Sequence, residues 1–328
     1  MKGLLSKHTN PAYNLATEEY LLRHTQEDVF FLYTNEPSII VGKHQNTLGE
    51  INYDFIQRKN LPVYRRLSGG GTVYHDPYNL NFCFIKTGEK GQLVNFARYS
   101  EPILMALREL GIEATFGKRH DIQIDGKKIS GNASHVYKNR VMHHGTLLFK
   151  ADLNTLNEAL KTNPLSIKDK AVKSVRSEVT NIYDHLQSKI DYPSFTQYIF
   201  NYLLAYYKTS SKLELNKDAE AQIKAYTETK YTTWEWNYGY SPNFSLNRTY
   251  RLTNNARIKA FLQVEKGRIT DCNLLSSDKN LNFLLENISH KMLGIQHSSY
   301  LIKDIISQIQ YSQLSQEDLQ RIERGFFS

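Results

Sequence analysis

The 328-residue chain has very little cysteine and no long apolar segment. Only Cys83 and Cys272 are present, far apart and without a Cys-x-x-Cys or Cys/His ligand spacing, which argues against a disulfide framework and a structural zinc site. No apolar run approaches the roughly 18 residues of a membrane-spanning helix. The N-terminus also lacks the apolar core and cleavage site of a signal peptide. We therefore expect a cytoplasmic protein with no membrane role.

Two widespread catalytic motifs are also absent. The chain contains neither the Gly-x-Ser-x-Gly of a hydrolase elbow nor the Gly-x-x-x-x-Gly-Lys-Ser/Thr of a P-loop. Its formal net charge is +8, but the cations are spread along the sequence instead of gathered in a basic tail. This pattern fits a nucleotide or an acidic protein surface as partner, or only a solubilising charge, and we expect no nucleic-acid partner.

The stretch from Arg65 to Asp76 is the most informative, because it sets a glycine triplet between an arginine pair and an expected strand. Glycines without Cβ let the backbone take positive φ and turn its N–H groups toward anionic oxygens. An isolated triplet is more often a flexible surface loop. Here β-rich segments lie on both sides, at residues 61–64 and 79–85, which favours a site for a nucleotide or an acyl phosphate.

A pair of lysines follows the dipeptide Asp125-Gly126, which is a strong signal for a tight hairpin. Alternation along the strand places Lys128 on the same face as Ser130 and Lys127 on the other face. A solvated charged pair is the simpler interpretation. The neighbouring hydroxyl and glycine nevertheless suit a lysine that holds a phosphate or carbonyl oxygen.

Two other candidates are the adjacent histidines His143 and His144 and the cysteine Cys83. Neighbouring histidines on a strand point to opposite faces, so they cannot easily share a metal ion. One of them can lie in the core and the other at a site, although two structural histidines are the default. Cys83 lies in an apolar strand, which is typical of a buried small hydrophobe and not of an activated nucleophile.

Periodicity predicts an α+β chain with mixed strands and surrounding helices. A first helix is expected after the N-cap Asn10, and a second ends at Gly111. Near the C-terminus a hairpin about Lys266-Gly267 precedes two helical stretches. We expect a large domain over residues 1–246 and a small α+β domain over residues 247–328. Helices are also expected at 51–59, 152–163 and 192–208, strands at 28–34, 38–44, 62–66, 113–135 and 139–149, and an irregular segment and candidate lid at 163–182.

Several long segments together resemble the lipoate–protein ligase family. RRLSGGGTVYHD, DGKKISGNA, HHGTLLF and SVRSEVTNI occur in this order, and NLATEEYLL, EPSIIVGKHQN and WEWNYGYSPNF are similar as well. The resemblance implies a catalytic domain like that of biotin ligases and octanoyl transferases, with a small C-terminal domain that swings. It also implies an ATP- and Mg²⁺-dependent ligase that forms lipoyl-adenylate (lipoyl-AMP), releases pyrophosphate and lipoylates one lysine of a lipoyl-domain protein.

The resemblance also assigns residues to the site. It implies that Arg66 contacts the nucleotide phosphate and that Lys128 is the catalytic lysine, holding the acyl carbonyl and the phosphate. It assigns no Mg²⁺ ligands. The implied positions are Arg66, Gly71, Thr72, Val73, Tyr74 and Lys128 for ATP and lipoyl-AMP, then Ser68, Gly69, Gly70, His75, Asn79, Asp121, Ser130, Ala133 and His144 for the pocket, and Lys173, Ser174, Val175, Arg176 and Val179 for the lid.

Four positions differ from the family pattern. Thr72 replaces an alanine, Tyr78 a glycine, Glu178 a basic residue and Tyr240 a lysine. The last two changes remove positive charge expected near the adenylate. They suggest a specialised acceptor or a weaker activity. The two cations central to the assignment, Arg66 and Lys128, are both present.

The expected acceptors are glycine-cleavage H protein, an H-like protein or the acyltransferase subunits of 2-oxoacid dehydrogenases, and we expect a monomer. The preferred acceptor and the choice between lipoate and octanoate stay open. The main alternative is an octanoyl or lipoyl transferase that uses a cysteine and no ATP. A biotin ligase and a non-catalytic lipoate-binding module are the others.

Overall fold

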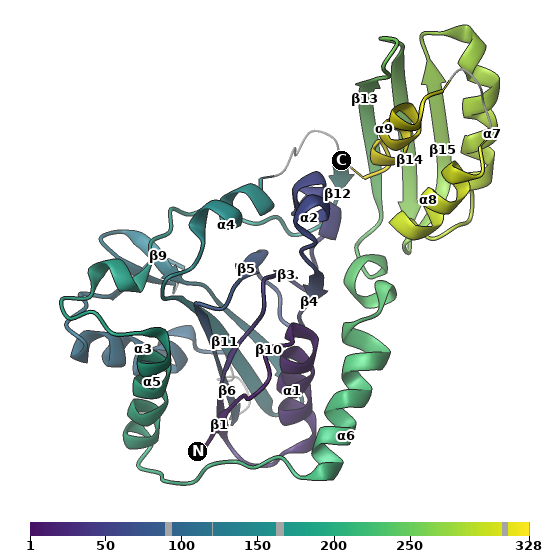
Figure 1. Ribbon diagram of the computed structural model, residues 1–328. Coiled ribbons are helices and arrows are strands. Elements are labelled where there is room, and N and C mark those ends of the chain that lie inside the picture. Colours follow the sequence, from purple (N-terminus) through teal and green to yellow (C-terminus); the bar gives the residue numbers. More distant parts are fainter. Residues whose placement is uncertain (89–93, 120, 162–166, 310–313, 328) are drawn as a thin grey trace. The chain divides into compact units, whose positions relative to one another are not determined.

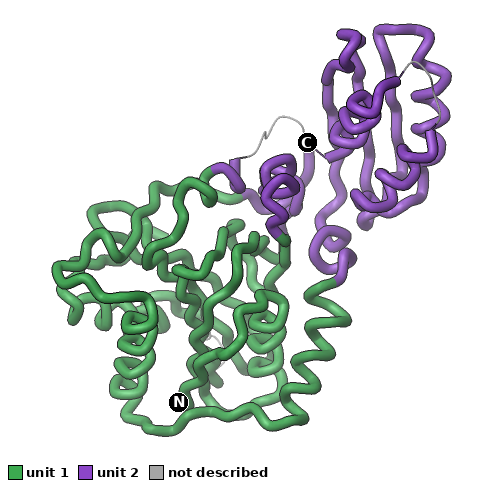
Figure 2. Tube along the Cα trace, in the orientation of Figure 1, with its two compact units in different colours: residues 1–43, 62–157, 174–232 green, residues 44–61, 158–173, 233–328 purple. Residues whose placement is uncertain are grey.

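The structure, a computed structural model, describes residues 1–88, 94–119, 121–161, 167–309 and 314–327. The chain forms two compact units, shown in Figure 2. Residues 1–43, 62–157 and 174–232 make up the first unit, and residues 44–61, 158–173 and 233–328 make up the second. The domain division between residues 246 and 247 stays a prediction. The mixture of sheets and helices confirms the expected α+β class.

A five-stranded sheet forms the centre of the first unit, in the order β1-β2-β6-β11-β10 (Figure 1). β1 pairs with β2 in parallel, and the other neighbours are antiparallel. The three inner strands β2, β6 and β11 are almost wholly buried, and β2 and β6 contain apolar runs at residues 29–33 and 82–85. The strands are β1 Lys2–Leu5, β2 Val29–Thr34, β6 Asn79–Thr87, β10 Asn132–Tyr137 and β11 Arg140–Leu148.

Two small sheets carry the segments that the sequence marked as functional. In the first, with the order β4-β3-β5, both strands that flank the glycine triplet pair with β3. The triplet therefore connects the two edges of one sheet. The second has the order β7-β8-β9 and contains the predicted hairpin at Asp125-Gly126, where both residues have positive φ, +50° and +75°. The strands are β3 Ser38–Val41, β4 Val63–Arg65, β5 Val73–His75, β7 Thr115–Phe116, β8 Ile122–Ile124 and β9 Lys127–Ser130.

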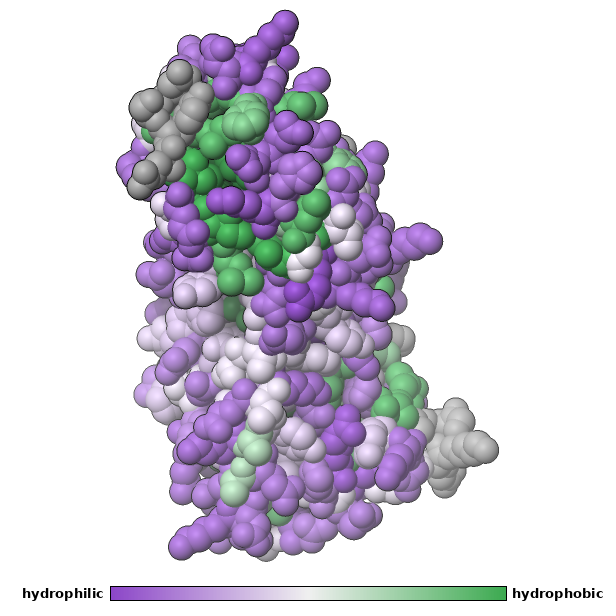
Figure 3. All heavy atoms as spheres, turned by 90° about the vertical axis from the view of Figure 1, so that its right-hand side faces the viewer, coloured by the Kyte–Doolittle hydropathy of each residue, from purple (hydrophilic) through white to green (hydrophobic). Residues whose placement is uncertain are grey.

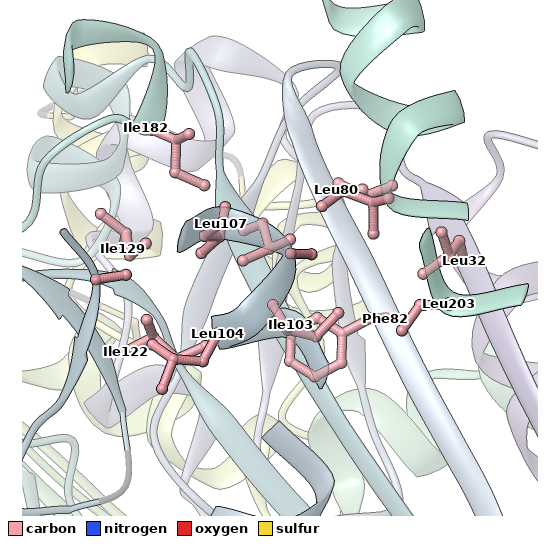
Figure 4. Packing of buried hydrophobic residues seen from close by; sticks show 14 of the residues in the cluster. Leu32, Leu80, Phe82, Ile103, Leu104, Leu107, Ile122, Ile129, Ile182 and Leu203 are labelled. Atoms are coloured by element: carbon pink, nitrogen blue, oxygen red, sulfur yellow. The ribbon is translucent and has the colours of Figure 1, made fainter. Parts of the chain in front are cut away.

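The core of the first unit lies between its sheets and the helices packed on them. Figure 4 shows Ile103, Leu104 and Leu107 of α3 packed among Phe82 of β6 and Ile122 of β8. The predicted N-cap is confirmed, since the Asn10 side chain accepts a bond from the Tyr13 N–H. The helices are α1 Pro11–His24, α3 Phe96–Glu109, α4 Leu153–Ala159, η2 Ile182–His185, α5 Tyr192–Tyr206, α6 Lys217–Tyr226 and the π-helix η3 Thr227–Tyr231.

The second unit contains a four-stranded sheet in the order β12-β13-β14-β15. Figure 1 shows α7, α8 and α9 beside its strands. The expectation of two final helices was wrong, because the chain forms α7, α8 and α9. Figure 3 shows apolar side chains gathered on the face in view. Leu275, Phe283 and Leu293 of this unit are exposed. The elements are η1 Thr47–Gly49, α2 Tyr53–Lys59, β12 Ile167–Asp169, η4 Glu235–Gly239, β13 Phe244–Arg251, β14 Arg257–Glu265, β15 Arg268–Ser276, η5 Lys279–Leu281, α7 Asn282–Met292, α8 Ser299–Ser307 and α9 Gln316–Arg324.

Other predicted boundaries differ from the structure. The helix expected at residues 152–163 ends at Ala159, and its last two positions lie outside the described residues. The irregular segment expected at residues 163–182 contains the short strand β12, which pairs with β13, and its first four residues are not described. Within the described ranges, no helix has both the length and the apolar content that crossing a bilayer requires.

Candidate functional site

The glycine loop, residues 66–72, closes around the side chain of Arg66. The guanidinium donates to the carbonyl oxygens of Ile40, Gly69 and Gly71 at 3.1, 2.6 and 2.7 Å. Its Nε donates to Ser68 Oγ at 3.0 Å. Arg66 is buried, and burial lowers its pKa to about 10, which leaves it a cation at neutral pH. In this structure Arg66 therefore organises the loop from beneath.

Glycine is required where this loop bends most sharply. Gly70 has φ of +86°, and a Cβ at this position would lie 3.1 Å from Arg66 Nη2 and 3.7 Å from Ala133 Cβ. The loop consequently lies against the start of β10. A Cβ on Gly71 would come within 3.0 Å of Ser174 Oγ, so the lid segment passes directly beside the loop.

A buried carboxylate–histidine–serine chain supports the loop from the side of the central sheet. His144 Nδ1 lies 2.9 Å from both Glu18 carboxylate oxygens, and His144 Nε2 lies 2.6 Å from Ser68 Oγ. Because Glu18 accepts, Nδ1 carries the proton and the Ser68 hydroxyl donates to Nε2. Tyr33 Oη also donates to Glu18, at 3.0 Å. Each donor in this buried hydrogen-bond network thereby has an acceptor.

His75, on β5, has a defined tautomer and one unused donor. Asn35 Nδ2 donates to His75 Nδ1 at 2.9 Å, while Asn35 Oδ1 accepts from Asn14 at 2.9 Å, which fixes the orientation of the amide. The proton of the ring is therefore on Nε2. That buried nitrogen has no partner in the described part of the chain, and neither does Asn79 Oδ1. Two buried polar atoms are thus available to a ligand or to water.

The side chains of the two adjacent lysines differ in exposure, as predicted. Lys127 is exposed, whereas Lys128 is partly buried, and its burial lowers the pKa of the ammonium, with Arg119 and Arg66 adding to the shift and Asp121 opposing it. A Cβ on Gly131 would lie 3.0 Å from Lys128 Nζ, so this glycine leaves room for the ammonium group. Lys128 is the lysine that faces inward.

The lid segment contacts the rest of the first unit at two places. Ser174 Oγ accepts from the Thr72 N–H at 2.9 Å, beside the glycine loop. Further along, the Lys128 N–H donates to the Glu178 carbonyl at 2.8 Å, and the Thr180 N–H donates to the Lys128 carbonyl at 3.1 Å. The segment therefore spans from the glycine loop to β9, the strand that carries Lys128.

A pocket of about 660 Å³ lies beside this segment. Lys127 and Arg176 contribute cationic side chains to its lining, and Leu153 contributes an apolar one. Val175 of the lid is 61% exposed, so a bound ligand or partner could cover it. The remaining lining residues are Asn157, Ser177, Glu178 and Val179.

All the predicted site residues except Lys173 lie in the first unit. Lys173 belongs to the second unit, where it pairs with Asp169 at 2.9 Å. Glu18 and Asn35 are functional candidates that the sequence interpretation missed. The predicted positions in the first unit, whose role in binding stays a prediction, are Arg66, Ser68, Gly69, Gly70, Gly71, Thr72, Val73, Tyr74, His75, Asn79, Asp121, Lys128, Ser130, Ala133, His144, Ser174, Val175, Arg176 and Val179.

The positions that depart from the family pattern lie in different settings. Thr72 is buried and in contact with the lid, whereas Tyr78 is 48% exposed with its ring against Tyr192. Glu178 is exposed and engages Lys128 only through its backbone carbonyl. Tyr240 is 45% exposed in the second unit, with its ring close to Trp236.

The two adjacent histidines point to opposite faces of β11 and Cys83 is buried, as predicted. His143 lies under α3, bonded to Ser100 and Ser134 at 3.1 and 2.9 Å. His144 faces the glycine loop. Cys83 is fully buried, and burial, together with the nearby Glu18 carboxylate, raises the pKa of its thiol well above the usual value. This is the opposite of nucleophile activation.

No group of three metal-ligating side chains occurs among the residues that the structure describes. Mg²⁺ at sites of phosphate chemistry commonly takes one or two carboxylates plus the phosphates of the substrate. Asp121, buried near Lys128, is one carboxylate in this region. The structure assigns no further ligand.

We expect acid to destabilise the protein through its buried histidines. Burial lowers the pKa of His75 to about 3, with Arg66 and His144 adding to the shift, and that of His143 to about 3. With an unfolded-state pKa of about 6.5, the unfolded chain binds more protons below that pH. The contribution of these buried histidines to the free energy of unfolding should therefore be complete above about pH 6.5, and it should decrease as the pH drops toward 4.

Urea denaturation across this pH range measures the effect. A His75→Asn enzyme should lose part of the slope, and His290→Asn, at an exposed position, should keep the wild-type slope. Stability independent of pH over the whole range would contradict the expectation.

Comparisons with known proteins agree with this geometry. The model of the lipoyl protein ligase A/B catalytic domain matches residues 10–204, and that of the bacterial lipoate protein ligase C-terminus matches residues 241–323. A lipoate–protein ligase of Bacillus subtilis is 38% identical over 302 residues, with 90% of each chain covered.

Two solved structures are similar in fold and sequence. A lipoate–protein ligase A bound with ATP is 25% identical, with a TM-score of 0.63 and with 73% of this chain and 100% of that chain covered. A bipartite lipoate–protein ligase studied with its E2 lipoyl domain, from Thermoplasma acidophilum, is 25% identical with a TM-score of 0.63, covering 73% of this chain and 96% of that one.

Proposed function

This chain belongs to the lipoate–protein ligase family, and from that membership we propose how its residues perform the reaction. The enzyme is an ATP-dependent ligase. It activates lipoate as lipoyl-adenylate with release of pyrophosphate, and it then transfers the lipoyl group to a lysine of a lipoyl-domain protein as an amide. The observation that supports this assignment best is the glycine loop built around Arg66, with Lys128 at the other end of the lid.

In the first step the carboxylate of lipoate attacks the α-phosphate of ATP, and negative charge grows on the phosphate oxygens. Lys128 offers a point charge to these oxygens, and backbone N–H groups of the glycine loop offer hydrogen bonds. The bonds that Arg66 makes with loop carbonyls support a second role for it. It holds the shape of the loop and adds positive charge beneath it. Mg²⁺, expected with ATP, would neutralise further phosphate charge.

In the second step the acceptor lysine must attack the acyl carbonyl as a neutral amine. Lys128 beside that carbonyl would polarise it and would repel an incoming ammonium, favouring the neutral form. No protein nucleophile is needed in this scheme. The unused His75 Nε2–H is a candidate donor to an oxygen of the bound adenylate.

The hydrogen bonds of the lid support a role in shielding the adenylate from water. Its bonds to Thr72 and Lys128 cross from the glycine loop to β9, over the residues that would hold the adenylate. Residues 174–181 would exclude water from the reactive mixed anhydride until the acceptor arrives.

We propose the finer assignments on the same basis. The acceptor is glycine-cleavage H protein, an H-like protein or an acyltransferase subunit of a 2-oxoacid dehydrogenase, and a bipartite relative studied with its E2 lipoyl domain supports the last of these. The enzyme acts as a cytoplasmic monomer, with the catalytic and accessory domains dividing near residue 246.

Replacement of Cys83 separates a ligase from a cysteine-dependent transferase. We expect Cys83→Ala to keep full lipoate- and ATP-dependent pyrophosphate release and full lipoylation, because the buried thiol has a raised pKa and takes no part in the chemistry. Coupled pyrophosphate assays measure the first activity, and intact mass spectrometry of the acceptor measures the second. Transfer that needs Cys83 and proceeds without ATP would establish the transferase instead.

A further inference from the structure

The sheet of the second unit has one buried and one exposed face. Figure 1 shows α7, α8 and α9 on one side of its strands. Residues that alternate toward this side are buried, as Leu246, Leu262 and Cys272 show by their register. The alternate positions are largely exposed. We call this second set of side chains the open face.

One end of the open face gathers positive charge. Arg251 of β13 lies directly opposite Arg257 of β14, and Lys259 follows two residues later on the same face. All three are exposed, and no ion pair within the described ranges joins any of them to a carboxylate. Like charges placed opposite one another destabilise a sheet, so this arrangement works against the stability of the unit.

The other end of the same face shows that the repulsion is not imposed by the strands. There Glu265 of β14 lies opposite Arg268 of β15, a pair of opposite charges. The same sheet therefore carries residues of opposite charge at one end of this face and an uncompensated basic cluster at the other. A basic cluster kept at a cost in stability indicates an acidic partner.

Apolar side chains lie beside the cations. Leu275 is 51% exposed and is the cross-strand partner of Lys259, and Phe261 lies half-buried on the same face. A small apolar area with a charged rim is the usual composition of a protein interface. Single-stranded nucleic acid would instead require several aromatic rings for base stacking, and Phe261 is the only ring at the centre of this described face.

We propose that Arg251, Arg257, Lys259 and Leu275 form a docking surface for an acidic face of the acceptor protein. This inference rests on the proposed function, in which the partner is a lipoyl-domain protein. The surface steers and orients the acceptor and takes no part in adenylation. The surface therefore lowers the KM for the acceptor and leaves the rates of the chemical steps unchanged.

Charge reversal in the full-length enzyme tests the surface. We expect Arg251→Glu, Arg257→Glu and Lys259→Glu together to raise the KM for an apo lipoyl domain of an acyltransferase subunit by about tenfold or more. Pyrophosphate release without acceptor, kcat and the melting temperature should keep their wild-type values. A matched enzyme with Lys279→Glu, Lys291→Glu and Lys303→Glu, the same charge change at exposed positions on η5, α7 and α8, should keep the wild-type KM.

The acceptor provides the complementary test. A lipoyl domain whose surface Asp and Glu residues are changed to Asn and Gln should have a raised KM with wild-type enzyme and should no longer distinguish wild type from the triple variant. An unchanged KM in the first triple variant, or an equal rise in the matched enzyme, overturns the proposal.

Two further outcomes have separate meanings. Wild-type enzyme that releases no pyrophosphate would refute the ligase function itself, independently of the docking surface. A single-stranded RNA oligonucleotide tests nucleic-acid binding. If wild-type enzyme binds it, the triple variant does not, and the KM for the lipoyl domain is the same in both enzymes, the surface binds nucleic acid and the proposal fails.

Discussion

Lys128→Ala should abolish adenylation, lowering lipoate-dependent pyrophosphate release by roughly 10²–10³-fold or more, a size typical of losing one preorganised charge at a reacting centre. Lys128 is the inward member of the lysine pair, with its ammonium over Gly131 and its backbone held by the lid. Because its partly buried side chain forms no ion pair within the described residues, the variant should stay folded. The initial rate of pyrophosphate release, with the melting temperature as a check on folding, measures the effect.

The adjacent lysine supplies a matched control. Lys127→Ala removes the same charge from an exposed position one residue away, so its adenylation rate should stay close to that of the wild type. Full activity in Lys128→Ala, or equal losses in both variants, would contradict the assigned role of Lys128.

Replacement of Arg66 should reduce both stability and activity. Its guanidinium satisfies the buried Ile40 carbonyl, the partly buried Gly69 and Gly71 carbonyls and Ser68 Oγ, so Arg66→Ala removes the donor from these acceptors. We expect a loss of about 3–5 kcal/mol in the free energy of unfolding, as for other broken buried charge networks. Adenylation should be lost as the glycine loop loses its shape. Urea denaturation and pyrophosphate assays measure the two effects.

Arg66→Lys separates charge from geometry. The lysine keeps the positive charge but cannot reproduce the planar fork, so this variant should also be strongly impaired. Arg98→Ala, which removes an exposed arginine of the same unit, should behave as the wild type. If Arg66→Ala lost activity with unchanged stability, Arg66 would act only on the ligand, and the loop-supporting role would be wrong.

Local features of the site could be predicted from the sequence where they depend on neighbouring residues. The Asp125-Gly126 turn fixes the hairpin, and strand alternation then separates Lys127 from Lys128 and His143 from His144. These are consequences of backbone geometry over a few residues.

Features that depend on distant contacts could not be predicted in the same way. The bond from Arg66 to Ile40 and the closure of the loop require the β4-β3-β5 pairing, which no local pattern specifies. The role of Glu18 had a signal that was not used. It lies between Leu15 and Leu22 on the buried stripe of α1, and a carboxylate there requires partners, which Tyr33 and His144 supply.

The last helix illustrates a second unused signal. Ser315 and Asp318 form a capping box at the start of α9, and their spacing alone marks a helix start. The polar composition of this helix concealed its narrow apolar stripe, in which Ile322 is buried.

The most direct test of the ligase assignment is intact mass spectrometry of an apo lipoyl domain incubated with the enzyme, lipoate, ATP and Mg²⁺. We expect the domain to gain the mass of one lipoyl group in amide linkage at a single lysine, only when ATP is present and not with Lys128→Ala. A domain that stays unmodified under these conditions, or that is modified equally well without ATP, would contradict the account.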